Sequence, residues 1–200
     1  MSKRAGANKE NYEETQRVFL AFARIEFATH GYLKASTTSI VEQSGMARGS
    51  LYYHFRDKED LFRKVFVRMT EESGKEIREE VASITDPLQA LKKGAEVFYT
   101  HCLDPVFRRI VLIEALVAIP YPERVALISK SYSELLVSLI SNAQEAGKLP
   151  KTIPASFLAV MIHGILAEHG RTLEFSQDPE RAKCKLVEIF NWTFDRLCQS

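Results

Sequence analysis

The chain has 200 residues, enough for one or two domains, and 46% of them are hydrophobic and 26% charged, as in ordinary soluble globular proteins. Its net charge of +1 excludes a strongly basic or strongly acidic protein. Residues 1–64 carry a net charge of +3 and the rest −2, which gives DNA binding only mild support.

The sequence shows no signal peptide, and its apolar run at 110–119 contains Glu114 and ends at Pro120. We therefore expect no membrane span and a cytoplasmic protein. The three cysteines are odd in number and scattered, at Cys102, Cys184 and Cys198. This pattern favours free thiols in a reducing compartment over a disulfide framework or a metal site.

Residues 1–10 are small and polar, which predicts a disordered arm; a basic arm that enters the DNA minor groove is the alternative. A helix with a regular apolar face is predicted from about residue 11 to residue 29. Gly31 suits its end, with Tyr32 packed behind it. We expect this helix to support the segment that follows.

The segment 36–58 contains two short helical patterns joined at Ser44-Gly45-Met46, and a short Gly-containing turn between two helices is typical of a helix-turn-helix. Thr37 or Thr38 is the expected N-cap of the first helix. Gly45 suits the left-handed position that ends it. The second helix is predicted at about 48–54, with Leu51 and Phe55 buried together.

That second helix leaves polar, aromatic and cationic side chains for another surface: Arg48, Gly49, Ser50, Tyr52, Tyr53 and His54. Arginine can bind guanine edges, hydroxyl groups can bind phosphates, and glycine lets the backbone approach closely. Such a face suits the major groove of DNA.

These residues resemble the DNA-binding domain of the TetR family of bacterial transcriptional regulators. A helix-turn-helix alone is weak support, but its turn, the Leu-Tyr-x-His-Phe run at 51–55 and Lys58 occur together here. Further matching positions are Gly31-Tyr32, Thr37-Thr38, Ile40 and Leu61. Ala47 departs from the family, which often has a capping Ser or Thr there, and this forgoes about 1 kcal/mol.

We predict a division of DNA contacts within this segment. Arg48, Gly49 and Ser50 open the recognition helix and are assigned to base edges, although Arg48 could instead bind a phosphate. The residues assigned mainly to phosphates are Thr38, Ser39, Tyr52, His54 and Lys58. Thr37 and Tyr53 complete the predicted DNA-binding set.

Asp57 is expected to cap a helix from Lys58 to about Val81, which would be roughly 35 Å long at 1.5 Å per residue. This helix is long enough to connect a DNA-binding end to a second domain. We therefore predict a helix-turn-helix domain at 1–57 and a ligand-binding and dimerisation domain at 58–200.

Asp-Pro pairs at 86–87, 104–105 and 178–179 each predict a helix start. The expected helices are 87–103, 105–118, 122–146, 154–175 and 179–198, with breaks at Pro120, Pro122 and the 147–150 segment. No strand pattern is present. The predicted fold is all-α with about nine helices, a three-helix DNA-binding domain followed by a helical bundle, and this order also resembles the TetR family.

The resemblance implies a homodimer in which the last two helices of each subunit form a four-helix interface. The residues predicted for it are Gly164, Ala167, Leu186, Ile189, Phe190, Phe194 and Leu197. The alternative is that they belong to the core of one subunit. A single DNA-binding head makes few contacts for a specific site, which favours the dimer.

A small-molecule effector site is predicted inside the bundle, with large apolar walls and a few polar groups. Its candidate residues are Phe98, Tyr99, Phe107, Val111, Glu114, Tyr132 and Met161. Each could instead be a core residue. In the family mechanism, ligand would change the angle of the helix that begins at Lys58 and so separate the two DNA-binding heads.

Other chemistry has little support. His163 and His169 are six residues apart and face different sides of a helix, and His101 and Cys102 are adjacent, so neither pair forms a metal site or a nucleophile with its base. No phosphate-binding glycine loop or nucleophile elbow is present. We predict no catalytic site, metal or cofactor; an enzyme and a helical interaction module without DNA are the rival classes.

The sequence therefore predicts a ligand-responsive transcriptional regulator, most simply a homodimeric repressor that binds a near-palindromic double-stranded DNA operator. An activator, or a ligand-independent regulator of the same fold, is the alternative.

Overall fold

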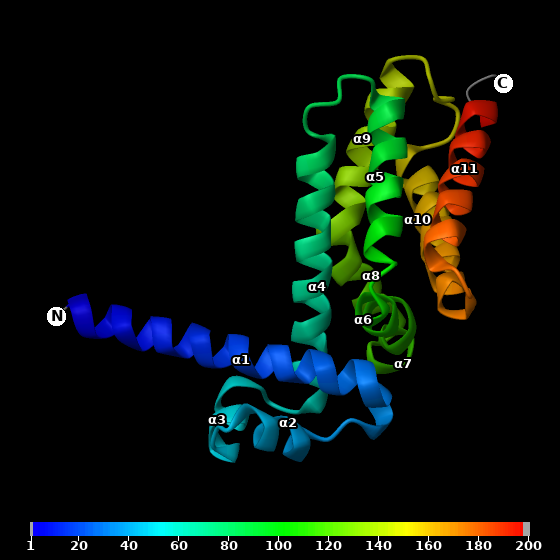
Figure 1. The fold of residues 1–200 in the computed structure, drawn as a ribbon. Coiled ribbons are helices and arrows are strands. Elements are labelled where there is room, and N and C mark those ends of the chain that lie inside the picture. Colours follow the sequence, from blue (N-terminus) through cyan, green and yellow to red (C-terminus); the bar gives the residue numbers. More distant parts are fainter. Residues whose placement is uncertain (1, 198–200) are drawn as a thin grey trace.

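The structure, a computed structural model, describes the backbone of residues 2–197 and the side chains of residues 10–196. Within this range the elements are helices joined by short loops, which confirms the all-α prediction. Three helices, α1 (Ser2–Lys34), α2 (Thr37–Ser44) and α3 (Arg48–His54), form one end of the molecule, here named the reading head. Figure 1 shows α2 and α3 beneath the long α1, with the other helices rising on its opposite side.

Helix α1 begins at Ser2, where the sequence predicted a disordered arm. No proline occurs in this segment and Gly6 is its single glycine, so no strong helix breaker separates it from the amphipathic part of the helix. Near its other end α1 breaks at Gly31, which has φ of +72°. This break is the predicted one, and it turns the chain toward α2.

The N-cap of α2 is Ser36, whose side chain accepts a hydrogen bond from the Ser39 amide at 3.3 Å. The prediction of Thr37 or Thr38 was therefore wrong by one or two residues, because all three hydroxyl residues are competent caps and the chain geometry selects among them. Gly45 ends α2 with φ of +66°, as predicted.

Helix α4 (Lys58–Val81) has the predicted bounds and begins with the predicted cap, in which Asp57 accepts from the Asp60 amide at 2.7 Å. Its first turns pack in the reading head, where the rings of Phe62 and Phe27 meet edge to face at 5.0 Å. Its last turns, with buried Ile77 and Val81, pack among the later helices. One apolar core runs through both regions along this helix.

The remaining helices form the bundle: α5 (Pro87–His101), α6 (Pro105–Phe107), α7 (Ala115–Ala118), α8 (Tyr121–Ile128), α9 (Glu134–Glu145), α10 (Ala155–Thr172), the 3₁₀ turn η3 (Leu173–Phe175) and α11 (Pro179–Leu197). Asp86 and Asp104 cap α5 and α6 as predicted. In Figure 1, α10 and α11 run side by side.

Two predicted helices contain π-helical segments, η1 (Arg108–Glu114) and η2 (Ser129–Ser133). In η2 the Ser131 carbonyl lies so close to Gly74 of α4 that a side chain there would collide with it. The same carbonyl accepts a hydrogen bond from Arg78 at 3.1 Å. The bundle thus uses a glycine and a widened turn to bring η2 against α4, a detail that periodicity does not reveal.

Candidate DNA-binding site

Helix α3 presents its polar side to solvent at the end of the reading head. Arg48 and Gly49 are exposed, Ser50 is half-buried, and the exposed fractions of Tyr52 and Tyr53 are 45% and 75%. The exposed residues Thr38, Arg48, Gly49, Tyr52 and Tyr53 are here named the reading face. On the opposite side of α3, Leu51 and the following Phe55 are buried, as predicted.

Polar contacts connect α2 and α3 across the reading face. The hydroxyl oxygens of Thr37 and Tyr52 lie 3.4 Å apart, and the Arg48 guanidinium lies 5.8 Å from the centre of the Tyr52 ring. The hydrogen bond with Thr37, and next the one with Arg48, lower the pKa of Tyr52. No side chain caps α3 at Ala47, as expected from the sequence. Arg48 therefore extends from an uncapped helix N-terminus, where the backbone N–H groups favour an anion.

Ser39, predicted to bind a phosphate, has its hydroxyl engaged inside the reading head. Its O–H donates to Glu26 Oε2 at 3.0 Å, and its oxygen accepts from Gln43 Nε2 at 2.8 Å. A serine has a single O–H, so none is left for a phosphate oxygen. The structure contradicts this assignment.

Glu26 accepts the hydrogen bond of the Ser39 hydroxyl, and the sequence did not predict this contact. Its residue is only 3% exposed, and its Oε1 accepts from the Ser36 amide at 2.9 Å. The carboxylate therefore holds the start of α2 against α1. An acidic residue on the same helix face as the apolar Ala23 and Phe27 was the available signal.

His54 was also assigned to phosphates, and its burial contradicts this. The residue is 6% exposed, and its ring lies 4.2 Å from that of Tyr12 and 6.4 Å from that of Phe19. Burial, and secondarily the charge of Lys64, lower its pKa. The enclosed imidazole supports α3 from behind, and Tyr12 covers it.

Lys58 turns back toward the end of α1. Its ammonium donates to the carbonyl oxygens of Leu33 and Ala35 at 3.2 and 3.3 Å, and it lies 5.0 Å from the centre of the Tyr32 ring. Two of its three N–H donors are thereby used within the protein. A phosphate contact from the third donor stays a prediction.

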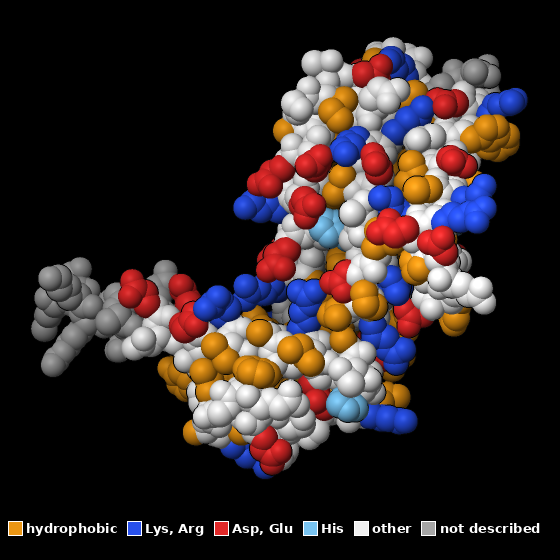
Figure 2. All heavy atoms as spheres, viewed as in Figure 1, with side chains coloured by type: hydrophobic (Ala, Val, Ile, Leu, Met, Phe, Trp, Pro, Cys, Tyr) orange, Lys and Arg blue, Asp and Glu red, His pale blue; other side chains and the backbone are white. Residues whose placement is uncertain are grey.

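The reading head is attached to the bundle by polar contacts as well as by α4. Glu114 of η1 accepts from the Tyr32 amide at 2.8 Å and pairs with Arg109 at 2.7 Å, and Arg24 of α1 pairs with Asp104 at 2.8 Å. Figure 2 shows basic side chains along this junction. Both carboxylate oxygens of Glu114 are engaged here, which contradicts its assignment to the effector site.

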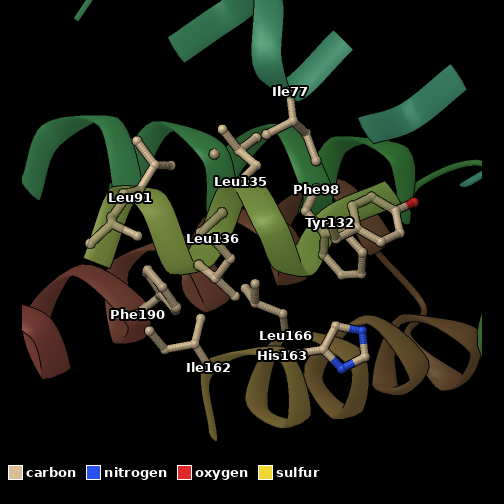
Figure 3. A pocket seen from close by; sticks show the side chains of 13 residues that line it. Ile77, Leu91, Phe98, Tyr132, Leu135, Leu136, Ile162, His163, Leu166 and Phe190 are labelled. Atoms are coloured by element: carbon tan, nitrogen blue, oxygen red, sulfur yellow. The ribbon is translucent and has the colours of Figure 1, made fainter. Parts of the chain in front are cut away.

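An apolar cavity lies inside the bundle between α4, α5, η2, α9, α10 and α11 (Figure 3). Phe98 and Tyr132 of the predicted effector set line it, together with His163. The Tyr132 hydroxyl is buried, and burial raises its pKa although a hydrogen bond with Ser73 acts in the opposite direction. The cavity volume is about 50 Å³, far below the roughly 300–1,000 Å³ of typical ligand pockets.

The other predicted effector residues lie elsewhere. Tyr99 is fully buried, with its hydroxyl 2.9 Å from His169 Nδ1, and Val111 is a 7% exposed core residue. Phe107 faces a separate cleft beside α1, and Met161 is 43% exposed on the outside of α10. Large apolar residues occur on every buried face, so residue type alone could not select those of the cavity.

The predicted dimer residues divide between core and surface. Phe190 and Phe194 are 3% and 2% exposed and stack on each other, Ala167 is 8% exposed, and Leu186 packs against the core. Phe190, Phe194 and Ala167 therefore belong to the core of the subunit, the alternative that the sequence left open, and Leu186 is partly buried. Gly164 and Ile189 are exposed, and the side chain of Leu197 lies outside the described residues.

Among the residues that the structure describes, no group of His, Cys, Asp or Glu side chains could hold a metal ion. None of the described helices is long and apolar enough to cross a membrane.

We expect Glu26→Gln to destabilise the reading head. The amide keeps one acceptor but places an N–H₂ group against donors at Ser36 and Ser39, so the free energy of unfolding should fall by about 1–3 kcal/mol. Urea unfolding measures this change. Glu42→Gln, an exposed position on α2, is the matched control and should change stability by less than about 0.5 kcal/mol. Equal stability of the two variants would contradict the structural role of Glu26.

Comparison with protein families gives two matches. Residues 19–65 match the model of bacterial regulatory proteins of the tetR family, and residues 88–197 match that of a tetracyclin repressor-like C-terminal domain. The chain is 25% identical over 192 residues to the transcriptional repressor Rv1474c of Mycobacterium tuberculosis, covering 92% of this chain and 95% of the relative. It is 40% identical over 62 residues to the repressor AcnR of Corynebacterium glutamicum, covering 31% of each chain.

Solved structures share the fold over nearly the whole chain. A TetR-family regulator from Pectobacterium atrosepticum has a TM-score of 0.78 at 24% identity, over 96% of this chain and 97% of that one. The regulator FadR of Bacillus subtilis, in complex with stearoyl-CoA, has a TM-score of 0.76 at 18% identity, over 86% and 96%.

The C-terminal family model alone covers more than half of the chain, and the N-terminal model covers the helix-turn-helix. The family and the relatives are DNA-binding regulators, so the enzyme class is rejected. The chain belongs to the TetR family of bacterial transcriptional regulators.

Proposed function

We propose that this regulator is a homodimeric repressor that binds a near-palindromic operator and is released from it by a small-molecule effector. The observation that carries the proposal is the reading face, which exposes Arg48, Gly49, Tyr52 and Tyr53 from a helix fixed by a buried core. Its similarity to the repressor Rv1474c over nearly the whole chain supports repression.

The reading face suggests how an operator would be recognised. The first residues of a recognition helix normally meet base edges, which assigns Arg48 and Gly49 to specificity. Thr38 and Tyr52 carry hydroxyl groups at the rim of the same face and suit phosphates. Two such heads related by a two-fold axis would occupy major grooves about 34–36 Å apart.

The last two long helices carry a second set of apolar residues on their outer sides. On α10, Phe157, Val160 and Met161 are 72%, 74% and 43% exposed at helical spacing, and on α11, Ile189 and Trp192 are 51% and 62% exposed. Contiguous exposed apolar surface is typical of protein interfaces. We therefore assign the dimer interface to these residues, with the exposed Gly164 allowing close approach.

The bundle cavity is the proposed effector site, and its size requires that it expand when a ligand enters. The FadR structure, which shares the fold, contains stearoyl-CoA. Here an apolar ligand would separate the helices around Phe98 and Tyr132.

Release would follow from the contacts at the junction. Asp104 and Glu114 belong to the α6–η1 segment of the bundle and bind Arg24 and the Tyr32 amide of α1. A ligand that shifted α5 and this segment would move those anchors and rotate the reading head. Ligand would then favour the conformation in which the two heads no longer match groove spacing.

We expect Arg48→Ala to cost about 1–3 kcal/mol on the correct operator and to relax preference at one base pair in each half-site. The operator can be isolated from DNA upstream of the protein's own gene, and affinity measured on a set of single-base variants. Arg68→Ala, on the α4 surface, is the control and should bind as wild type. Equal losses on every sequence would assign Arg48 to a phosphate instead.

Val160→Glu should weaken dimerisation at least tenfold, because it places two charges at a two-fold interface and removes about 1.5 kcal/mol of apolar burial per subunit. Sedimentation velocity at several protein concentrations measures the dimer fraction. Val117→Glu introduces the same change at a 60% exposed position on α7. A monomeric wild type, or a Val160→Glu variant as dimeric as Val117→Glu, would refute the proposed interface.

Apolar compounds that raise the melting temperature should also lower operator affinity, since a ligand at about 100 times its Kd adds about 2.7 kcal/mol of stability. Ala95→Leu fills the cavity wall and should abolish this response while leaving operator binding unchanged. Leu116→Phe, at a 49% exposed position, is the control. Compounds that bind the cavity without changing DNA affinity would contradict release and favour a ligand-independent regulator.

A further inference from the structure

The exposed ring of Tyr53 on the reading face has an aromatic neighbour outside α3. Its centre lies 5.9 Å from that of Tyr12 of α1, and the two rings meet edge to face at an angle of 77°. Among the described residues, the other ring contact of Tyr53 is with His54, the next residue of α3, at 5.4 Å. Tyr53 is 75% exposed, so core packing does not fix its side chain. The contact with Tyr12 is therefore the restraint that α1 places on the direction of this side chain.

Tyr12 is itself held in place by the interior of the reading head. Its ring lies 4.2 Å from that of the buried His54, which in turn lies 6.4 Å from the ring of Phe19 in the core. Because α1 begins at Ser2, Tyr12 lies about three turns inside this helix and not at a fraying end. A continuous set of ring contacts thus leads from the core of the reading head to the exposed Tyr53.

We propose that Tyr12 is a positioning residue for DNA binding, whose ring holds Tyr53 in the side-chain conformation in which the Tyr53 hydroxyl reaches a DNA phosphate. Tyrosine hydroxyls are among the groups that donate to phosphate oxygens. Edge-to-face ring pairs attract each other beyond the apolar area that they bury. The inference rests on the proposed DNA contact of the reading face, and it gives a role in that contact to a residue outside the helix-turn-helix.

The size of the effect follows from the conformations open to Tyr53. An aromatic side chain in a helix chooses mainly between two χ1 rotamers. Apparent affinity falls in proportion to the fraction of molecules in the binding-competent conformation. If one of the two rotamers presents the hydroxyl to DNA, loss of the Tyr12 ring lowers that fraction to about one half, which weakens binding about twofold per reading head. A dimer with both heads on DNA would lose about fourfold.

The test measures binding of the full-length protein to a fluorescently labelled duplex of arbitrary sequence, about 30 base pairs long, at low salt, because phosphate contacts do not depend on sequence. Tyr53→Phe removes the hydroxyl but keeps the ring, and should weaken binding by at least about tenfold. Tyr12→Ala should weaken it about twofold to fourfold. In the Tyr53→Phe background Tyr12→Ala should have no further effect, because the contact that Tyr12 positions is already absent.

Two variants serve as controls. Tyr12→Phe keeps the ring and should bind the duplex as wild type. Ile25→Ala removes a 55% exposed apolar side chain from another part of α1 and should also bind as wild type. Circular dichroism should show that all variants keep their helical content.

Wild-type binding by Tyr12→Ala would overturn the proposal, since Tyr53 would then need no positioning. An equal loss in Tyr12→Phe would mean that the Tyr12 hydroxyl contacts DNA itself, and an equal loss from Tyr12→Ala in both backgrounds would mean general damage to α3. Wild-type binding by Tyr53→Phe would also overturn it, by removing Tyr53 from the DNA contacts of the reading face. A duplex of arbitrary sequence tests neither repression nor effector release, so these results leave the repressor proposal untouched.

Discussion

Helix α4 is the constraint on which the rest of the structure depends, because its buried side belongs to the core of the reading head at one end and to that of the bundle at the other. Phe62 packs against Phe27 of α1, and Ile77, four turns later, lines the bundle cavity. A continuous helix transmits rotation and translation with little bending. Any change of the cavity wall at Ile77 therefore acts directly on the element that carries the reading head.

The reading head is also attached to the bundle by polar contacts, in contrast to the apolar packing along α4. Gly31 adopts a backbone conformation that glycine reaches without strain, and this directs the Tyr32 amide to the Glu114 carboxylate. A side chain at Gly31 would also collide with that carboxylate. Hydrogen bonds and ion pairs at a partly exposed junction can exchange partners, whereas the packed interior of the reading head resists deformation. The reading head is thus held together by apolar packing and joined to the bundle by polar contacts as well as by α4.

The sequence predicted the elements better than the site because helix ends are set locally. Asp57, Gly45 and the Asp-Pro pairs act within a few residues, so the bounds of α3 and α4 were correct. The roles of Ser39 and His54 depend on Glu26 and Tyr12, which lie far away in the sequence, and no local pattern identifies such partners. The resemblance to a family indicated the location of the DNA-binding surface. It did not indicate which hydroxyl or imidazole groups are used inside the protein.

The last two long helices show a further limit, because each is apolar on two sides. On α11, Phe190 and Phe194 face inward while Ile189 and Trp192 face outward, and on α10 the cavity residue Ile162 is adjacent to the exposed Met161. Periodicity identifies such helices as packed on two sides but does not tell which side meets the subunit's own core. Because α10 joins the cavity to the outer apolar surface, a ligand that displaces it would alter both at once. In the proposed homodimer, subunit arrangement and cavity occupancy would therefore be linked through the two faces of one helix.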